Sequence, residues 1–173
     1  QQKLPREKAL ALLWPEQSTS RARHLLSEAL YVLRRHMGEG AIQSAQDDLA
    51  LDSDIIWSDV AAFQEAVTAA SSEVASLYRG PFLDGFHLKH APEFDVWAET
   101  LRDRFARQFG RALESLAVAA ATSGDALAAA EWWGRLAEHD PFSSRIAARY
   151  MNALVSTGER ARAIRIATAH VTR

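Results

Sequence analysis

A repeat with a period of 34 residues constrains the second half of this chain more than any other feature. Thr-Ser-Gly-Asp at 122–125 recurs as Ser-Thr-Gly-Glu at 156–159, and at the same offset Ala129 aligns with Ala163. A period of this length is typical of stacked helical hairpins, each of which buries its apolar face against the next. We therefore expect helical hairpins here, with Asp140-Pro141 at the turn from one to the next.

The composition predicts helices in the rest of the chain as well. Only 8 of the 173 residues are Gly and 5 are Pro, the two residues that most disfavour a helix interior. The absence of Cys excludes disulfides, thiolate catalysis and Cys-ligated metals, and it fits a reducing compartment such as the cytoplasm. No apolar run approaches the ~20 residues of a membrane span, so we expect no membrane partner.

The formal net charge of −2 is the sum of unequal parts. Residues 1–46 hold seven Lys and Arg against four acids, residues 47–100 hold two against eleven, and residues 101–173 hold eleven against seven. Segments of opposite charge indicate different roles or different partners. The average therefore conceals a basic first segment, for which a nucleic acid is a candidate partner.

The basic segment contains one clear amphipathic helix, predicted over 21–37. The hydroxyls at 18–20 can cap its start, and Gly38 ends it. Its apolar residues recur three and four apart: Ala22, Leu25, Leu26, Ala29, Leu30, Leu33 and Met37. The opposite face carries Arg23, Ser27, Tyr31 and Arg34, with His24, Glu28 and Arg35 beside them. From residue types alone, a solvated basic surface is favoured over a binding surface for this face.

Other patterns predict the elements around this helix. We expect a short helix from Pro5 to Trp14, a small β-hairpin over 41–51 and a single helix of nearly twenty residues from about 58 to 77. A loop with several aromatic residues follows over 79–86, and a long helix begins near Pro92. The chain is thus divided into a first part at 1–55 and an all-helical second part at 56–173.

Two stretches resemble known bacterial regulators. Leu13-Trp14-Pro15, followed by Ala22-Arg23 and Leu33-Arg34-Arg35, resembles the second and third helices of an OmpR-type winged helix in SARP-type antibiotic regulators. The string Leu-Tyr-Arg-Gly-Pro-Phe-Leu-Asp-Gly-Phe at 77–86 resembles the bacterial transcriptional activator domain that follows the winged helix in that family. The resemblance covers nearly the whole chain.

The resemblance implies a mainly α fold, with a partial winged helix-turn-helix at 1–55 and a tetratricopeptide-like helical domain at 56–173. It makes 21–37 the recognition helix and 41–51 the wing, whose acidic tip we expect to contribute little to binding. In the family the winged helix opens with a short sheet and a first helix, and neither precedes Gln1 here, so we expect this chain to be part of a longer regulator. The residues expected to contact DNA are Arg21, Arg23, His24, Ser27, Glu28, Tyr31, Arg34 and Arg35.

The implied function is a DNA-binding transcriptional activator of bacterial promoters, located in the cytoplasm. Its implied partners are double-stranded promoter DNA in the intact parent, RNA polymerase or an attached sensor domain, and a second copy of itself. An interaction or dimerisation module that does not bind DNA is the alternative. We expect no enzyme, cofactor or metal, because the chain lacks a G-x-S-x-G elbow and a phosphate-binding loop, and His87 and His90 have no further ligand set.

Overall fold

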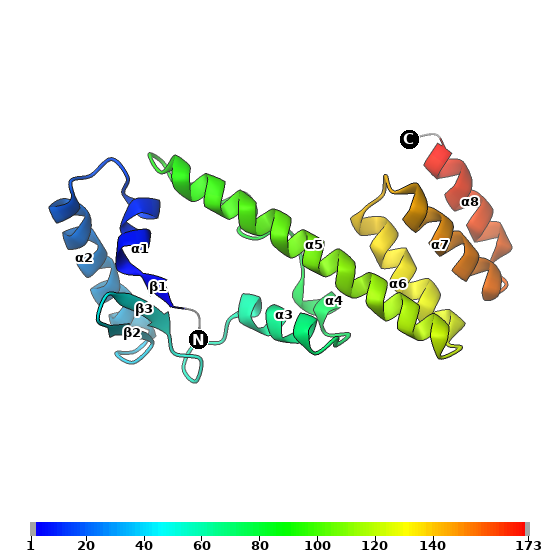
Figure 1. Ribbon diagram of the computed structural model, residues 1–173, viewed down its shortest axis with the longest axis horizontal. Coiled ribbons are helices and arrows are strands. Elements are labelled where there is room, and N and C mark those ends of the chain that lie inside the picture. Colours follow the sequence, from blue (N-terminus) through cyan, green and yellow to red (C-terminus); the bar gives the residue numbers. More distant parts are fainter. Residues whose placement is uncertain (1–2, 172–173) are drawn as a thin grey trace. The chain divides into compact units, whose positions relative to one another are not determined.

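The computed structural model describes residues 3–171, which form eight helices and three short strands (Figure 1). This is the expected mainly α fold, with a partial winged helix-turn-helix followed by a helical domain. The chain divides into two compact units, each described by itself below. Unit 1 comprises Gln1–Ala62 and Gly80–Arg104, and unit 2 comprises Phe63–Arg79 and Phe105–Arg173.

Unit 1 begins with two helices and a small antiparallel sheet. The helix expected at 5–14 and the amphipathic helix expected at 21–37 are both present, and the hairpin expected at 41–51 forms two of the strands. The elements are β1 (Leu4–Pro5), α1 (Arg6–Leu13), α2 (Thr19–Met37), β2 (Ile42–Ala45) and β3 (Asp48–Leu51).

The sheet has the order β1-β3-β2, with a first strand that the sequence patterns do not predict. Leu4 pairs with Leu49 of β3, and the backbone N–H of Arg6 donates to the carbonyl of Asp47 at 2.7 Å. A strand of two residues carries no alternation that a pattern could reveal. It is specified by its partner, more than forty residues later in the chain.

A small apolar core joins α1, α2 and the sheet. Its buried residues come from all three: Ala9, Leu10, Ala22, Leu26, Leu30, Ile42 and Leu49, with Trp14 packed against them. The predicted stripe on α2 is therefore correct over most of its length. Its last two residues, Leu33 and Met37, are 42% and 39% exposed, because the core ends near Ile42.

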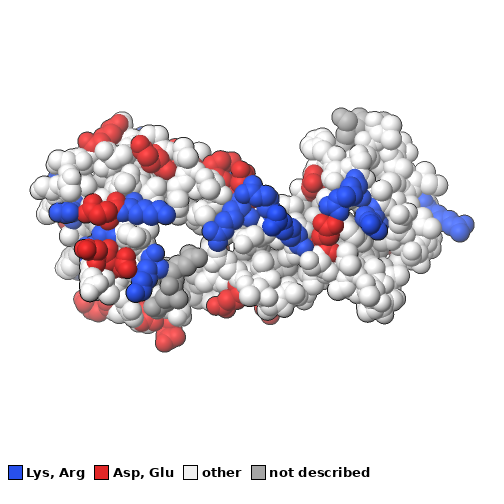
Figure 2. All heavy atoms as spheres, in the orientation of Figure 1, with Lys and Arg blue, Asp and Glu red and all other residues white. Residues whose placement is uncertain are grey.

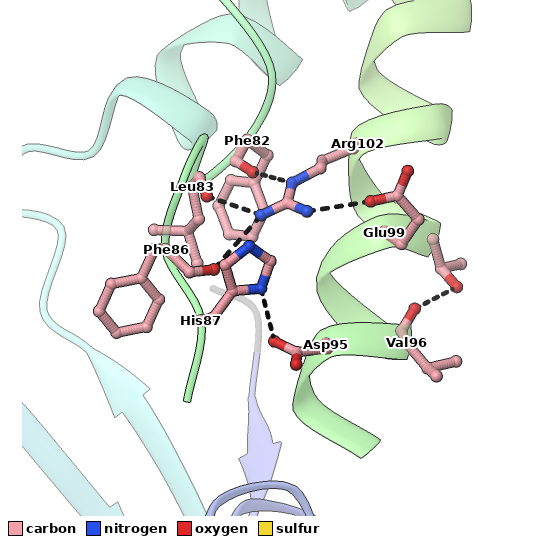
Figure 3. Close-up of polar contacts among 9 residues, drawn as sticks. Phe82, Leu83, Phe86, His87, Asp95, Val96, Glu99 and Arg102 are labelled. Carbon is pink, nitrogen blue, oxygen red and sulfur yellow. Dashed lines mark hydrogen bonds and ion pairs between the residues drawn. The ribbon is translucent and has the colours of Figure 1, made fainter. Parts of the chain in front are cut away.

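The rest of unit 1 is the loop after Gly80 and the first part of α5 (Pro92–Thr122). The half-buried Arg102 on α5 holds this loop: its Nε donates to the carbonyl of Phe82 at 2.8 Å, and its terminal nitrogens donate to the carbonyl of Leu83 at 2.7 Å and to Glu99 at 2.9 Å (Figure 3). The rings of Phe82 and Trp97 pack edge to face, 5.8 Å apart. The hydrogen bonds of Arg102 and the ring contact of Phe82 thus both hold the predicted loop against α5.

The segment from 58 to 77 contains the one clear error in the predicted elements. The single helix expected there is two helices, α3 (Asp59–Thr68) and α4 (Val74–Leu77). The break lies at Ala70, which has a φ of 51°, and the N–H of Ser71 turns back to the carbonyl of Ala66 at 2.9 Å. Gly or Asn usually occupies such a left-handed position, so an Ala gives no sequence signal for the break.

The 34-residue repeat is confirmed as two helical hairpins, formed by the second part of α5 with α6 (Ala126–His139), and by α7 (Ser144–Ser156) with α8 (Arg160–Val171). Their turns have the same geometry. Gly124 and Gly158 both have a positive φ, of 83° and 86°. The next N–H bonds the carbonyl five residues back in each turn, at 2.9 Å from Asp125 and at 2.8 Å from Glu159.

Small residues let these helices approach closely. A Cβ at Gly134 on α6 would lie 3.1 Å from the ring of Tyr150 on α7, so the ring occupies the space that any side chain there would need. Of the adjacent tryptophans, Trp133 is buried, whereas Trp132 is half-buried with the guanidinium of Arg135 5.2 Å from its ring centre. The pair therefore divides between the core and the surface, as two neighbouring helical positions must.

Candidate nucleic-acid interface

Helix α2 is the candidate recognition helix, and its start is fixed locally. Ser18 is its N-cap, and the Ser18 hydroxyl accepts a hydrogen bond from the backbone N–H of Arg21 at 3.4 Å. Helix α1 and the sheet pack against its apolar face. The face turned away from that core is therefore open along the length of the helix.

The residues on this open face form one continuous stripe, here called the outer stripe. They follow one another at intervals of three and four residues, the spacing that keeps side chains on one side of a helix. All of them are exposed, and Tyr31 is 65% exposed. The outer stripe consists of Arg21, His24, Glu28, Tyr31 and Arg35.

Polar contacts along the outer stripe are few. Nε2 of His24 lies 3.2 Å from a carboxylate oxygen of Glu28, one turn later. Within residues 3–171, the side chains of Arg21 and Arg35 make no hydrogen bond or ion pair. The stripe thus presents two cations, one near each end, and a hydrogen-bonding pair between them.

The other three predicted contact residues lie at the border between the outer stripe and the core. Arg23 is exposed and pairs with Glu7 of α1 at 2.8 Å, an interaction that raises the pKa of its guanidinium. Ser27 donates to the carbonyl of Arg23 at 2.9 Å. Arg34 is half-buried, and its Nε and one terminal nitrogen both donate to the carbonyl of Ile42, at 3.0 and 2.9 Å.

Arg34 also joins α2 to the β2–β3 hairpin. A terminal nitrogen of Arg34 donates to the hydroxyl of Ser44 at 2.6 Å, and Arg6 donates to the same hydroxyl at 3.2 Å. Gln43 on the neighbouring position of β2 donates to Asp52 at 2.7 Å. These polar groups are occupied within the unit, which makes Arg34 a residue that positions the hairpin. The sequence alone does not show this role, because the acceptor of Arg34 is a backbone carbonyl.

The surface charge around α2 is mixed in sign. On the face seen in Figure 2, acidic and basic side chains alternate over the part of the molecule that holds α1, α2 and the sheet. The hairpin tip carries Asp47, with no Lys or Arg between 41 and 51. Long-range attraction to a polyanion is therefore weak here, and binding would depend on contacts by the individual cations of α2.

The described part of the chain gives little evidence for a metal site or for a helix that spans a membrane. No group of three or more potential metal ligands occurs within residues 3–171. His87 instead lies 3.3 Å from Asp95, and His90 lies 3.9 Å from Glu16 (Figure 3 shows the first pair). No described helix is both long enough and apolar enough to cross a membrane.

The class of protein follows from a comparison with known families. A family model described as the bacterial transcriptional activator domain matches residues 58–167, which is more than half of the chain. The chain therefore belongs to the bacterial transcriptional activator domain family, a regulatory family and not a catalytic one. No curated protein matches the chain. The matched residues begin after α2 and the hairpin, so the role of α2 rests on its own geometry.

Proposed function

We propose that this protein is a DNA-binding transcriptional activator in which residues 1–55 bind promoter DNA and residues 56–173 contact other proteins. The observation that carries the proposal is the outer stripe of α2. It is an exposed row of polar side chains directly opposite the face that the core buries. An α-helix with this division can enter the major groove while its own domain holds it from behind.

The side chains of α2 have distinct roles in this proposal. Arg21, His24 and Glu28 lie in the first half of the helix and would read base edges, where Arg is suited to guanine and Glu to the amino group of cytosine. Tyr31 and Arg35 lie in the second half and would contact backbone phosphates. Arg23 and Ser27 would act at the border of the contact, and Arg34 would hold the wing in place.

Selection from a random duplex pool tests the proposal without a known promoter. The full chain is used to select duplexes over several rounds, and one selected duplex, labelled with fluorescein, is titrated with protein at several salt concentrations. We expect Arg21→Ala/Arg35→Ala to weaken binding by at least tenfold, because each Arg contributes a charged contact. The slope of log affinity against log salt should fall by about one for each phosphate that the variant no longer neutralises.

The matched control is Arg160→Ala/Arg165→Ala, which removes two exposed Arg side chains from α8 in unit 2. It should leave both the affinity and the salt slope unchanged. Equal losses of affinity in the control and in Arg21→Ala/Arg35→Ala would mean that net charge alone is being measured. Failure to select any duplex, or unchanged affinity in Arg21→Ala/Arg35→Ala, would refute the assignment of α2.

A further inference from the structure

Unit 2 contains a groove that DNA binding by α2 does not use. Its volume is about 460 Å³, within the range of ligand-binding sites in proteins. Helices α5 and α7 form its two walls, and α6 forms its floor. Val118 of α5 lines one wall, Arg149 and Asn152 line the other, and Ala129 and Trp133 lie at the floor.

The α7 wall supplies the polar chemistry of this groove. Arg149 and Asn152 are exposed and lie three residues apart, so they project from the same side of the helix. Within residues 3–171, neither side chain takes part in a hydrogen bond or an ion pair. A cation and an amide, the latter with both donors and an acceptor, therefore stand beside each other at the groove.

The carboxylate of Glu114 is paired with another arginine, Arg145, and makes no hydrogen bond or ion pair with Arg149. Glu114 on α5 accepts hydrogen bonds from both terminal nitrogens of Arg145, one of them at 3.1 Å. This fork of two bonds lowers the pKa of Glu114, and the charge of Arg149 adds to the effect. Because Arg145 already pairs with this carboxylate in both positions, the charge of Arg149 remains available to a ligand.

The apolar part of the groove favours an extended chain. Ala129 at the floor and Ala153 on the α7 wall have only methyl side chains, which allows a ligand backbone to approach closely. The lined part of α7 runs from Arg149 to Ser156, which spans roughly 10 Å of helix. That length corresponds to about three residues of an extended chain. A helical ligand, about 10–12 Å wide with its side chains, fills more space than this groove encloses.

We propose that this groove binds an extended, acidic peptide segment of a partner protein. A carboxylate of the peptide pairs with Arg149, its backbone exchanges hydrogen bonds with the amide of Asn152, and a small or apolar side chain packs against the exposed Val118. The proposal rests on the protein-contact half of the function proposed above, for which it names a site and a class of partner.

Selection of peptides from a random library tests the site. The full chain is immobilised, phage-displayed octapeptides are selected on it, and a selected peptide labelled with fluorescein is titrated by anisotropy. We expect the selected sequences to be enriched in Asp and Glu. Arg149→Glu should weaken binding more than tenfold because it reverses the charge, and Asn152→Ala should weaken it several-fold.

The control is Arg165→Glu, which makes the same change of charge on the exposed surface of α8 and should leave peptide binding unchanged. Circular dichroism confirms that each variant is folded. Absence of any selected peptide, enrichment of basic or purely apolar sequences, or equal binding by Arg149→Glu would each overturn the proposal. The selected DNA duplex is titrated in parallel, so loss of peptide binding alone is distinguished from failure of the α2 assignment.

Discussion

Helix α2 of unit 1 and helix α7 of unit 2 begin alike but are packed differently. Each is amphipathic and has a serine N-cap, Ser18 for α2 and Ser143 for α7. Helix α7 is packed between α6 and α8, whereas α2 packs on one side only, against α1 and the sheet. The elements that surround a helix, and not its amphipathic pattern, thus decide how much polar surface remains for a partner.

The largest effect in this comparison is expected from the core of the hairpins. Leu154 on α7 is fully buried, so Leu154→Ala leaves a cavity between helices that cannot easily close. We expect a loss of about 2–5 kcal/mol in the stability of unit 2. Hydrogen exchange of α7 amides measures this loss locally.

The matched control for that experiment is the next residue on the same helix. Val155 is 47% exposed, and Val155→Ala should change the exchange of α7 by no more than about 0.5 kcal/mol. Similar losses of stability in both variants would show that α7 is not held by its neighbours in the way described.

Within α2, the adjacent residues Arg34 and Arg35 allow a contact inside the unit to be compared with an exposed side chain. Arg34→Ala removes the donors to the Ile42 carbonyl and to Ser44, so it should destabilise unit 1 by about 1–3 kcal/mol. Arg35→Ala removes an exposed side chain, so it should leave stability within about 0.5 kcal/mol and weaken DNA binding directly. Urea titration of both variants, together with the duplex titration, separates the two effects.

Two results would contradict the roles assigned to Arg34 and Arg35. Equal stability of the two variants would mean that Arg34 does not hold the hairpin. Full DNA affinity in Arg35→Ala would remove the second half of α2 from the proposed contact.

Sequence patterns predict the parts of this fold that local residues decide. The hairpin turns at Gly124 and Gly158 follow from a glycine that adopts a positive φ followed by an acid, and both signals are adjacent in the chain. The core of α2 follows from residues three and four apart, such as Leu26 and Leu30. Strand β1 and the break at Ala70 could not be predicted, because one depends on a distant partner and the other on a residue with no turn preference.

In the candidate site, too, features that depend on distant parts of the chain could not be predicted from the sequence. Residue spacing predicts Arg34 on the open face of α2 with Arg35 beside it, and the structure reverses the two: Arg35 lies in the outer stripe, whereas Arg34 lies at its border with the core. Their roles differ because one points at the carbonyl of Ile42, which the hairpin brings within 3.0 Å. Which side chains remain available to a partner is therefore decided by tertiary contacts.

The smallest expected effect concerns the ion pair that joins α5 and α7. Hydrogen bonding from Arg145 lowers the pKa of Glu114 in the folded protein, so this pair stabilises unit 2 above the unfolded pKa of Glu, about 4.3. The contribution is lost as the pH falls from there through the folded pKa. Because the Glu114 side chain is 35% exposed and Arg145 lies open to solvent, we expect this contribution to be the smallest of those considered. Glu114→Gln should therefore lose less stability than the unsubstituted chain between pH 7 and pH 3 in thermal unfolding. Glu138→Gln, on the exposed side of α6, is the control. If stability falls with pH to the same extent in Glu114→Gln and in the unsubstituted chain, the ion pair contributes nothing.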